Sequence, residues 1–303
     1  IVIGIGIVIG GFIATPALID WSSKKELFTT QIERLTGLEA KISGDLQVSY
    51  FPEPRAYLEE IVLKSERSIT PFARIERISA RLGLWGLFYG DISFHSLTVQ
   101  GAEFTITRLP DQTFNFMPHQ SSEDERLKGF ESLFGTESNI ENISIENARA
   151  TFQPLFEGES VRLNNISGTI STGGARGALE YDGTFTLEKE AYTLKALFSG
   201  RESPDSPLGL NLKLDKRSGD AGFIYNGVLD YVDYEPRLKG EFDITLPAFG
   251  TFVTAFRKDL RVPFDAEGWP LKTAGMLSLD GNAWDVEFDK LKYGPLSLKG
   301  HIK

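Results

Sequence analysis

The sequence predicts a mainly β protein, in which an N-terminal transmembrane helix and a short amphipathic helix precede an elongated, curved antiparallel sheet that forms an open apolar groove. Three observations predict this fold class. The first nineteen residues, Ile1 to Ile19, contain no charged side chain. Most of the remaining chain alternates apolar and polar residues with a period of two, which is typical of strands with one buried face. Beyond the anchor, helical periodicity occurs in only two short segments, too few to cover such a sheet.

The apolar N-terminal segment predicts one pass through a membrane. At the α-helical rise of about 1.5 Å per residue, nineteen residues span roughly 28 Å, close to the bilayer hydrocarbon thickness of about 30 Å. A cleaved signal peptide is the alternative, but its apolar core would be shorter. We therefore expect residues 1–19 to be the anchor. The side chains expected in the membrane or at its boundary are Ile1, Ile5, Ile9, Phe12, Ile19 and Trp21.

A short amphipathic helix is predicted after the anchor. Ser23 and Glu26 have the S-x-x-E spacing of a capping box, and apolar residues then recur at helical spacing as far as Gly37. Glycine often ends a helix because it adopts the left-handed backbone conformation without strain. The pattern predicts a helix from about Lys24 to Thr36.

The period changes to two after the helix, which predicts the first strands of the sheet. These strands are expected at residues 38–42, 44–51, 58–64, 74–82 and 92–108. In the last of them, Phe104 and Ile106 lie on one face, whereas Thr105 and Thr107 lie on the other. Residues 20–117 are therefore expected to contain the helix and the start of the groove.

A polar connection and a second run of strands complete the chain. Residues 118–139 are rich in polar and charged side chains and are expected to be a long connection. Residues 140–303 return to strand alternation and continue the groove, with a short helix near residues 248–258. The dipeptides Asp182-Gly183 and Asp280-Gly281 are typical of hairpin turns and predict turns at both places.

Composition argues against several classes of function. The net charge is -10 with a pI near 5.0 and no basic stripe, so nucleic acid is not an expected partner. The absence of cysteine excludes disulfides and thiolate metal sites, although it leaves the cellular compartment open. His95, His119 and His301 are isolated and lack the spacing of zinc ligands. Because no catalytic motif occurs either, we expect no enzymatic activity, no cofactor and no metal.

The apolar face of the predicted sheet must be covered by another layer or by a ligand. Two arrangements remain. One is a closed sandwich or barrel with a dry core. The other is a curved, trough-like sheet whose apolar surface contacts acyl chains, and the predicted membrane anchor favours this second arrangement.

Several stretches of the sequence resemble the AsmA family of Gram-negative envelope proteins. They are residues 16–21 (PALIDW), 42–54 (ISGDLQVSYFPEP), 78–92 (ISARLGLWGLFYGDI), 97–102, 242–245 and 291–300. The resemblance implies an inner-membrane anchor, a body in the periplasm, and a repeating β groove related to bridge-like lipid transfer proteins. Lys24 and Lys25, taken alone, would favour the cytoplasm for the body.

The expected function is therefore that of a single-pass, non-enzymatic inner-membrane protein whose periplasmic groove serves phospholipid transport or outer-membrane lipid homeostasis. Transfer requires no reacting residue, because a buried methylene contributes about 0.8 kcal/mol by leaving water. Its expected partners are phospholipid acyl chains, the inner membrane and other envelope proteins. The residues expected to contact lipid are Phe104, Ile106, Leu212, Phe242, Ile244, Leu279, Val286 and Phe288. The alternative is a scaffold or chaperone for outer-membrane protein assembly that works through sheet edges.

Overall fold

The structure is a computed structural model of the chain. It describes residues 21–49, 53–65, 68–83, 94–107, 109, 114–116, 140–153, 160–172, 178–187, 189–199, 206–219, 221–232, 235–247, 269–280 and 283–302. These ranges contain sixteen strands, one α-helix and one 3-10 helix, which confirms the mainly β fold class. The chain divides into two compact units, residues 1–160 (unit 1) and residues 161–303 (unit 2).

Three sequence predictions concern segments outside the described residues: the anchor at residues 1–19, the polar connection at 118–139 and the short helix near 248–258. Within the described ranges, no helix is both long and apolar enough to cross a bilayer.

The amphipathic helix of unit 1 has the predicted bounds to within one residue, but its start is capped differently. It is α2 (Lys25–Thr36), preceded by the 3-10 helix η1 (Trp21–Lys24). The capping-box prediction is wrong, because the 3-10 turn moves the N-cap position to Lys24, which makes no side-chain cap hydrogen bond. At the other end Gly37 adopts φ 66°, and its N–H donates to the carbonyl oxygen of Glu33 at 2.7 Å.

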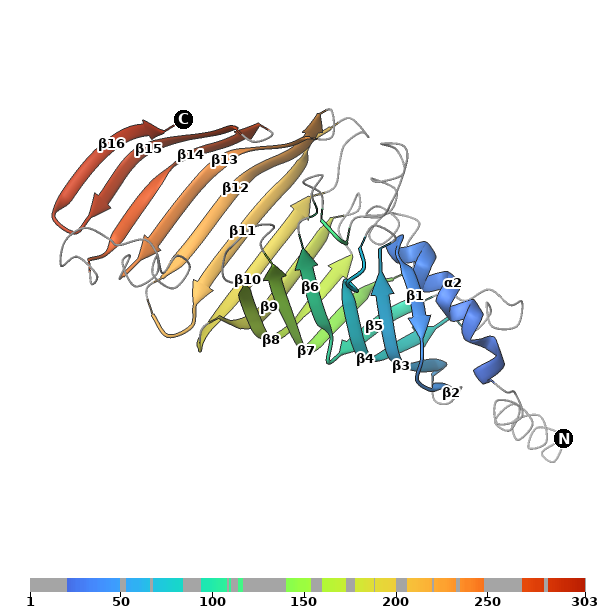
Figure 1. The fold of residues 1–303 in the computed structure, drawn as a ribbon. Coiled ribbons are helices and arrows are strands. Elements are labelled where there is room, and N and C mark those ends of the chain that lie inside the picture. Colours follow the sequence, from blue (N-terminus) through green and yellow to red (C-terminus); the bar gives the residue numbers. More distant parts are fainter. Residues whose placement is uncertain are drawn as a thin grey trace, which may run out of the picture. The chain divides into compact units, whose positions relative to one another are not determined.

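The strands of unit 1 form one sheet against which α2 packs (Figure 1). They are β1 (Glu39–Ile42), β2 (Leu46–Ser49), β3 (Arg55–Lys64), β4 (Ala73–Leu82), β5 (Phe94–Gln100), β6 (Glu103–Thr107) and β7 (Asn142–Gln153). Their order is β1-β3-β4-β5-β7, with β2 beside β3, and β6 beside β4 and β7. The predicted strand at 92–108 is split into β5 and β6 at Gly101, which has φ 61°.

The sheet of unit 1 is mixed, so the prediction of a purely antiparallel sheet is wrong. Strand β7 runs parallel to β5 and β6, with Leu97 paired to Ile143 and Phe104 paired to Ala150. Parallel neighbours cannot be joined by a tight hairpin and need a long connection. Residues 108–141 supply the required length between β6 and β7.

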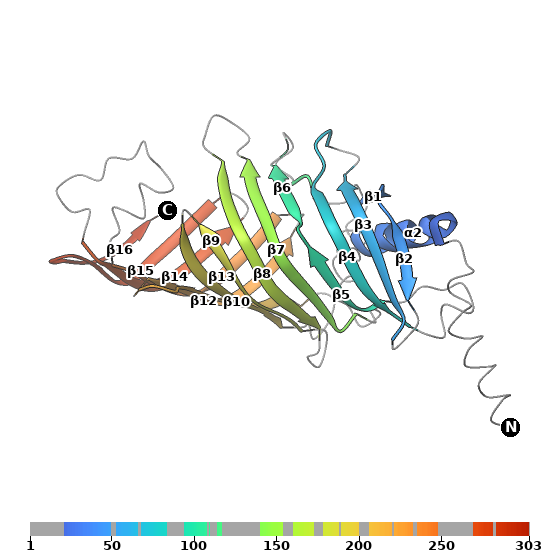
Figure 2. The same cartoon turned by 90° about the horizontal axis from the view of Figure 1, so that it is seen from below.

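Helix α2 buries its apolar side against the sheet of unit 1 (Figure 2). Phe28 and Ile32 are buried. The Phe28 ring centroid lies 6.5 Å from that of Phe94 on β5. Because Phe94 is paired with Leu82, another buried residue, the helix packs on the apolar face of this sheet.

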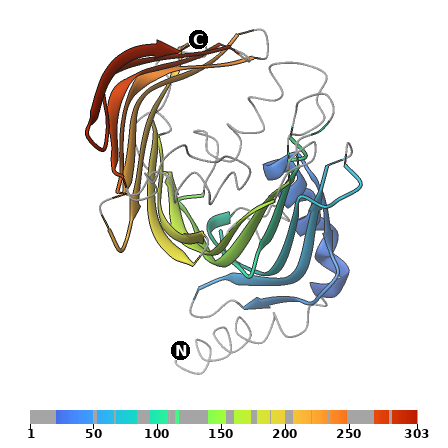
Figure 3. The ribbon, with the colours of Figure 1, turned by 60° about the vertical axis from the view of Figure 1, so that its left-hand side comes forward.

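Unit 2 is a meander in which each strand pairs antiparallel with the next (Figure 3). The strands are β8 (Val161–Thr172), β9 (Leu179–Leu187), β10 (Glu190–Ser199), β11 (Leu208–Lys216), β12 (Gly222–Val232), β13 (Glu235–Leu246), β14 (Leu271–Asp280), β15 (Ala283–Tyr293) and β16 (Leu296–Ile302). They are visibly curved. The described part of unit 2 contains no helix.

One of the two predicted hairpin turns in unit 2 is confirmed. Asp280 of β14 pairs with Ala283 of β15, so the chain reverses after Asp280 as predicted. The turn predicted at Asp182-Gly183 is wrong, because both residues lie inside β9. There Gly183 is paired with Gly168 on β8, and the close approach of neighbouring atoms rather than a turn accounts for the glycine.

Candidate functional site

The strand register of unit 2 places its apolar residues on one side of the sheet. Leu212 is paired with Tyr225, Tyr225 with Phe242, Phe242 with Gly275, and Gly275 with Phe288. Residues directly opposite each other on antiparallel strands point to the same face. We call the face that carries this row the apolar face of unit 2, and the other side its polar face.

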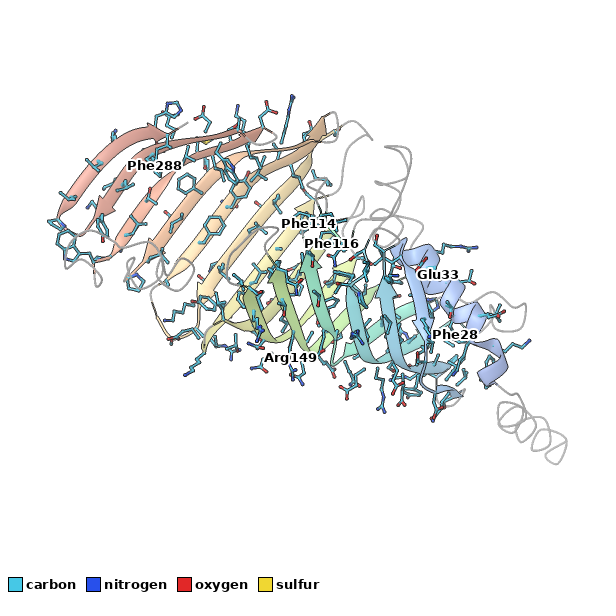
Figure 4. The ribbon with its side chains drawn as sticks, in the orientation of Figure 1. Phe28, Glu33, Phe114, Phe116, Arg149 and Phe288 are labelled. Carbon is cyan, nitrogen blue, oxygen red and sulfur yellow. The ribbon has the colours of Figure 1, made fainter. Side chains whose placement is uncertain are left out.

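The centre of the apolar face is a buried hydrophobic cluster. Leu210 is 7 % exposed, Tyr225 1 % and Phe242 6 %. Half-buried residues packed around these three come from the same face: Phe198, Leu212, Phe223, Leu238, Ile244, Leu277, Val286 and Phe288. The rings of Phe242 and Phe288 meet edge to face with centroids 6.1 Å apart, a favourable aromatic geometry. Figure 4 labels Phe288 on β15.

Toward the last two strands the apolar face becomes exposed. Trp284 is 56 % exposed, Leu296 52 %, Leu298 57 % and Ile302 60 %. Trp284 is paired with Leu279, and the other three are paired with apolar-face residues of β15, so all four extend the same face. Contiguous apolar side chains open to solvent typically mark a surface that binds another molecule.

The polar face of unit 2 carries cross-strand ion pairs. Lys195 Nζ lies 2.8 Å from Asp182 Oδ2, and Arg237 Nε lies 2.8 Å from Asp280 Oδ1. The hydrogen bond to Asp182 and its negative charge raise the pKa of Lys195. Such exposed pairs contribute little to stability but keep this face wetted. The large apolar residues exposed on it are Leu197, Ile224 and Val228.

Six of the eight predicted lipid-contact residues lie together on the apolar face of unit 2. They are Leu212, Phe242, Ile244, Leu279, Val286 and Phe288. The sequence left open which face of the sheet the apolar residues of each strand would occupy. The strand register places these six on the same face. Sequence reasoning missed the most buried residue of the cluster, Tyr225, although its alternation with Phe223 and Leu229 along β12 was a signal that could have identified it.

The other two predicted residues, Phe104 and Ile106, lie on β6 of unit 1. Phe104 contacts protein rings, since its centroid lies 5.6 Å from that of Phe72, which in turn lies 5.6 Å from Phe116. Phe114 stacks on Phe116 with centroids 5.4 Å apart, and Figure 4 labels both. In unit 1 this part of the apolar face is therefore occupied by its own aromatic side chains.

Groups that could carry chemistry are sparse among the described residues. No cluster of three or more histidine, aspartate or glutamate side chains that could hold a metal ion occurs in those ranges. The most perturbed groups on the apolar face are two tyrosines. Burial raises the pKa of Tyr225, and burial together with the charge of Asp182 raises the pKa of Tyr181, so both hydroxyls stay protonated at neutral pH. The apolar face of unit 2 is suited to binding an apolar ligand.

The AsmA family matches the chain over residues 1–188. The match includes η1, α2, all the strands of unit 1, and β8 and β9 of unit 2. Comparison with curated proteins and with solved structures returned no match. Because the matched segment covers more than half of the sequence and contains four of the six stretches whose residues resemble this family, the chain belongs to the AsmA family.

Proposed function

We propose that this protein is a membrane-anchored periplasmic protein whose apolar sheet face binds phospholipid acyl chains, in phospholipid transport or outer-membrane lipid homeostasis. The observation that carries the proposal is the apolar face of unit 2. A buried aromatic and aliphatic cluster at its centre continues into four exposed apolar side chains on β15 and β16. Membership of the AsmA family supports an envelope role.

The physical basis of binding is the removal of hydrocarbon from water. Each buried methylene contributes about 0.8 kcal/mol, so an apolar surface that follows an acyl chain can hold it without any covalent step. The face presents aromatic and branched aliphatic side chains at its centre, whereas the ion pairs Lys195–Asp182 and Arg237–Asp280 are on the opposite side of the sheet. The Lys216–Glu190 pair lies on the apolar face where β10 begins and β11 ends. Residues 1–19 would hold the body at the inner membrane, where phospholipid is available.

Charged substitutions on the two faces of unit 2 test this proposal. In the full chain, Val286→Asp combined with Phe288→Asp places carboxylates on the apolar face, where an acyl chain would have to desolvate them. We expect phospholipid that co-purifies with the protein to be lost, as measured by lipid extraction and mass spectrometry. The matched control is Leu197→Asp combined with Ile224→Asp, which changes exposed apolar residues of the same sheet on its polar face.

Two results decide the outcome of this test. Circular dichroism should show that both double variants keep their β content, which separates loss of binding from loss of fold. Equal lipid content in the apolar-face variant, the control and the wild type would refute binding on the apolar face.

The edge of the sheet favours a second candidate, a scaffold for outer-membrane protein assembly. Strand β16 is the last in the strand order and has a pairing partner only on its β15 side within the described chain. The edge strand of a sheet can accept a further strand from another protein. Leu298 and Ile302 would continue the apolar face into the added strand.

Site-specific photo-crosslinking distinguishes the two candidates. A photoreactive side chain at Leu279, on the apolar face, should form adducts with phospholipid if the first candidate is correct. One at Lys299, on the edge strand, should form adducts with an unfolded outer-membrane β-barrel protein added to the purified chain if the second is correct. Lipid adducts at Leu279 with no client adduct at Lys299 would reject the scaffold.

A further inference from the structure

Two tyrosines on the apolar face of unit 2 lie over pairs of glycines. Gly227 and Gly240 are register partners on β12 and β13, and a Cβ built on Gly240 would lie 2.7 Å from Tyr225 Oη. Gly168 and Gly183 are register partners on β8 and β9.

At this second pair, a Cβ on Gly183 would lie 2.5 Å from Tyr181 Cζ, and one on Gly168 would lie 3.0 Å from Tyr181 Cε2. Each tyrosine therefore occupies space that a side chain at the glycine positions would need. Backbone atoms are close as well: a Cβ on Gly183 would lie 2.8 Å from Ser167 O, and one on Gly240 would lie 2.5 Å from Gly227 Cα. The paired glycines therefore admit both the rings and the close approach of the strands.

The two sites share one sequence pattern and one row of the sheet. In both, the glycine follows the tyrosine by two positions, as Tyr181 to Gly183 and Tyr225 to Gly227. The register joins Tyr181 to Ala196, Ala196 to Leu212, and Leu212 to Tyr225, so the two rings belong to one row. With neighbouring strands about 4.8 Å apart, three strand spacings separate them by about 14 Å.

The orientation of Tyr225 removes its hydroxyl from the apolar surface. The oxygen is buried against Gly227 and Gly240 and has no hydrogen-bond partner among the residues that the structure describes. A ring laid along the strand in this way does not rise above its neighbours as an upright side chain would. The residues packed around the cluster that contains Tyr225, Phe198, Leu212 and Leu238 among them, have hydrocarbon side chains.

This surface chemistry selects the occupant. A peptide strand laid on the cluster would leave its own N–H and C=O groups without partners, at a cost that hydrophobic contact does not offset. An acyl chain has no such groups. Hydrocarbon is therefore the occupant that the cluster fits.

We propose that Tyr181 and Tyr225, each lying on its glycine pair, set the clearance of the apolar face and so determine how much acyl chain it holds between β8 and β13. We call the two sites the tyrosine–glycine seats. The inference rests on the proposed function and adds specificity-determining residues to it. A side chain at a seat glycine would push the ring upward into the space of the lipid, whereas removal of the ring would deepen the face.

The test measures phospholipid bound per protein after the purified full chain is incubated with vesicles of phosphatidylethanolamine and phosphatidylglycerol. Gly183→Ala should lower the bound phospholipid to roughly half, because an added methyl group displaces the ring. Combining it with Tyr181→Ala should restore part of the binding, because the ring no longer competes for space although Ser167 O still lies 2.8 Å from the added methyl group. The matched control is Gly300→Ala, also on the apolar face, where a Cβ would meet no atom within 4 Å.

A second set of variants adds no atoms and so does not depend on the glycine variant folding. Tyr181→Ala with Tyr225→Ala should raise the amount of bound phospholipid, and Tyr181→Phe with Tyr225→Phe should leave it unchanged, since the phenyl rings remain. If the wild type binds no phospholipid, the proposed function fails. If the wild type binds phospholipid but every seat variant matches Gly300→Ala, the seats have no role and the inference is overturned.

Discussion

Asn115 is fully buried although its side chain is an amide, because the end of β6 supplies partners for its backbone N–H and for both polar atoms of its side chain. Its backbone N–H donates to Thr107 O at 3.0 Å, and its Oδ1 accepts from Thr107 N–H at 2.9 Å. Its Nδ2 donates to Thr105 O at 2.8 Å. These three hydrogen bonds fix Asn115 to the end of β6 and so position its sequence neighbours Phe114 and Phe116.

Asn115→Ala should therefore destabilise the protein. It leaves the Thr107 N–H and the Thr105 carbonyl without their partners, at a cost of about 1–3 kcal/mol in the free energy of unfolding. Chemical denaturation measures the change. Asn211→Ala, at an exposed position on the polar face of unit 2, is the control and should change stability little. Equal effects of the two substitutions would contradict the role assigned to Asn115.

We expect Tyr225 to make the free energy of unfolding depend on pH in the alkaline range. Burial raises its pKa above the value of 10.0 for an unperturbed tyrosine, so the folded state keeps the proton longer than the unfolded state does. Its contribution is intact below pH 10.0 and is lost as the pH rises from there through the folded pKa. We expect Tyr225→Phe to reduce the fall in the unfolding midpoint between neutral and strongly alkaline pH. An identical fall in wild type and variant would show that Tyr225 does not contribute.

At the scale of elements, the boundaries of α2 show which local signals were sufficient. Gly37 has φ 66° and donates its N–H back to Glu33, so glycine is needed by the backbone conformation itself. The expected cap at the start did not form, because η1 continues directly into the helix. A helix end that depends on one backbone angle is thus more predictable than a start that depends on a choice between neighbouring cap positions.

Gly37→Ala should lower the free energy of unfolding by about 1 kcal/mol, the usual cost of a left-handed conformation for a residue with a Cβ. Gly219→Ala is the control, since a Cβ there would meet nothing within 4 Å and the residue has no left-handed φ. Urea denaturation of both variants measures the difference. If Gly37→Ala were no less stable than Gly219→Ala, the conformational argument would be wrong.

At the scale of the whole molecule, the apolar faces of the two units differ in what covers them. In unit 1, Phe28 and Ile32 of α2 and the aromatic residues around Phe72 pack against the sheet. The described part of unit 2 has no helix, and its apolar face ends in exposed side chains, Trp284 among them. Such a face must be covered by another layer or by a ligand.

The fluorescence of Trp284 can report whether acyl chains contact the apolar face of unit 2. In a variant that keeps it as the only tryptophan, phospholipids with brominated acyl chains should quench its fluorescence, because bromine quenches on contact. The control moves the tryptophan to the polar face of the same sheet by Ile224→Trp in a background without Trp284. Equal quenching at the two positions would show that lipid does not prefer the apolar face.

Much of the fold could be predicted because the signals are local. The alternation that placed Leu212, Phe242 and Ile244 on strands requires only the two-residue period of a pleated chain. The parallel pairing of β7 could not be predicted, since it joins residues far apart in the sequence and depends on how the long connection returns. Gly183 was misread because glycine marks both turns and close approaches within a sheet, and only its neighbours distinguish the two.

By itself the sequence determined which residues are strand-forming, which side chains are apolar, and the family, because these follow from composition, period and local pattern. Only the tertiary structure decided that six of the predicted residues share one face, that Phe104 packs against protein rings, and that Tyr181 and Tyr225 lie on paired glycines. The physical reason is register: which residues oppose each other is set by hydrogen bonds between distant segments, and a shift of one residue would send every side chain to the other face.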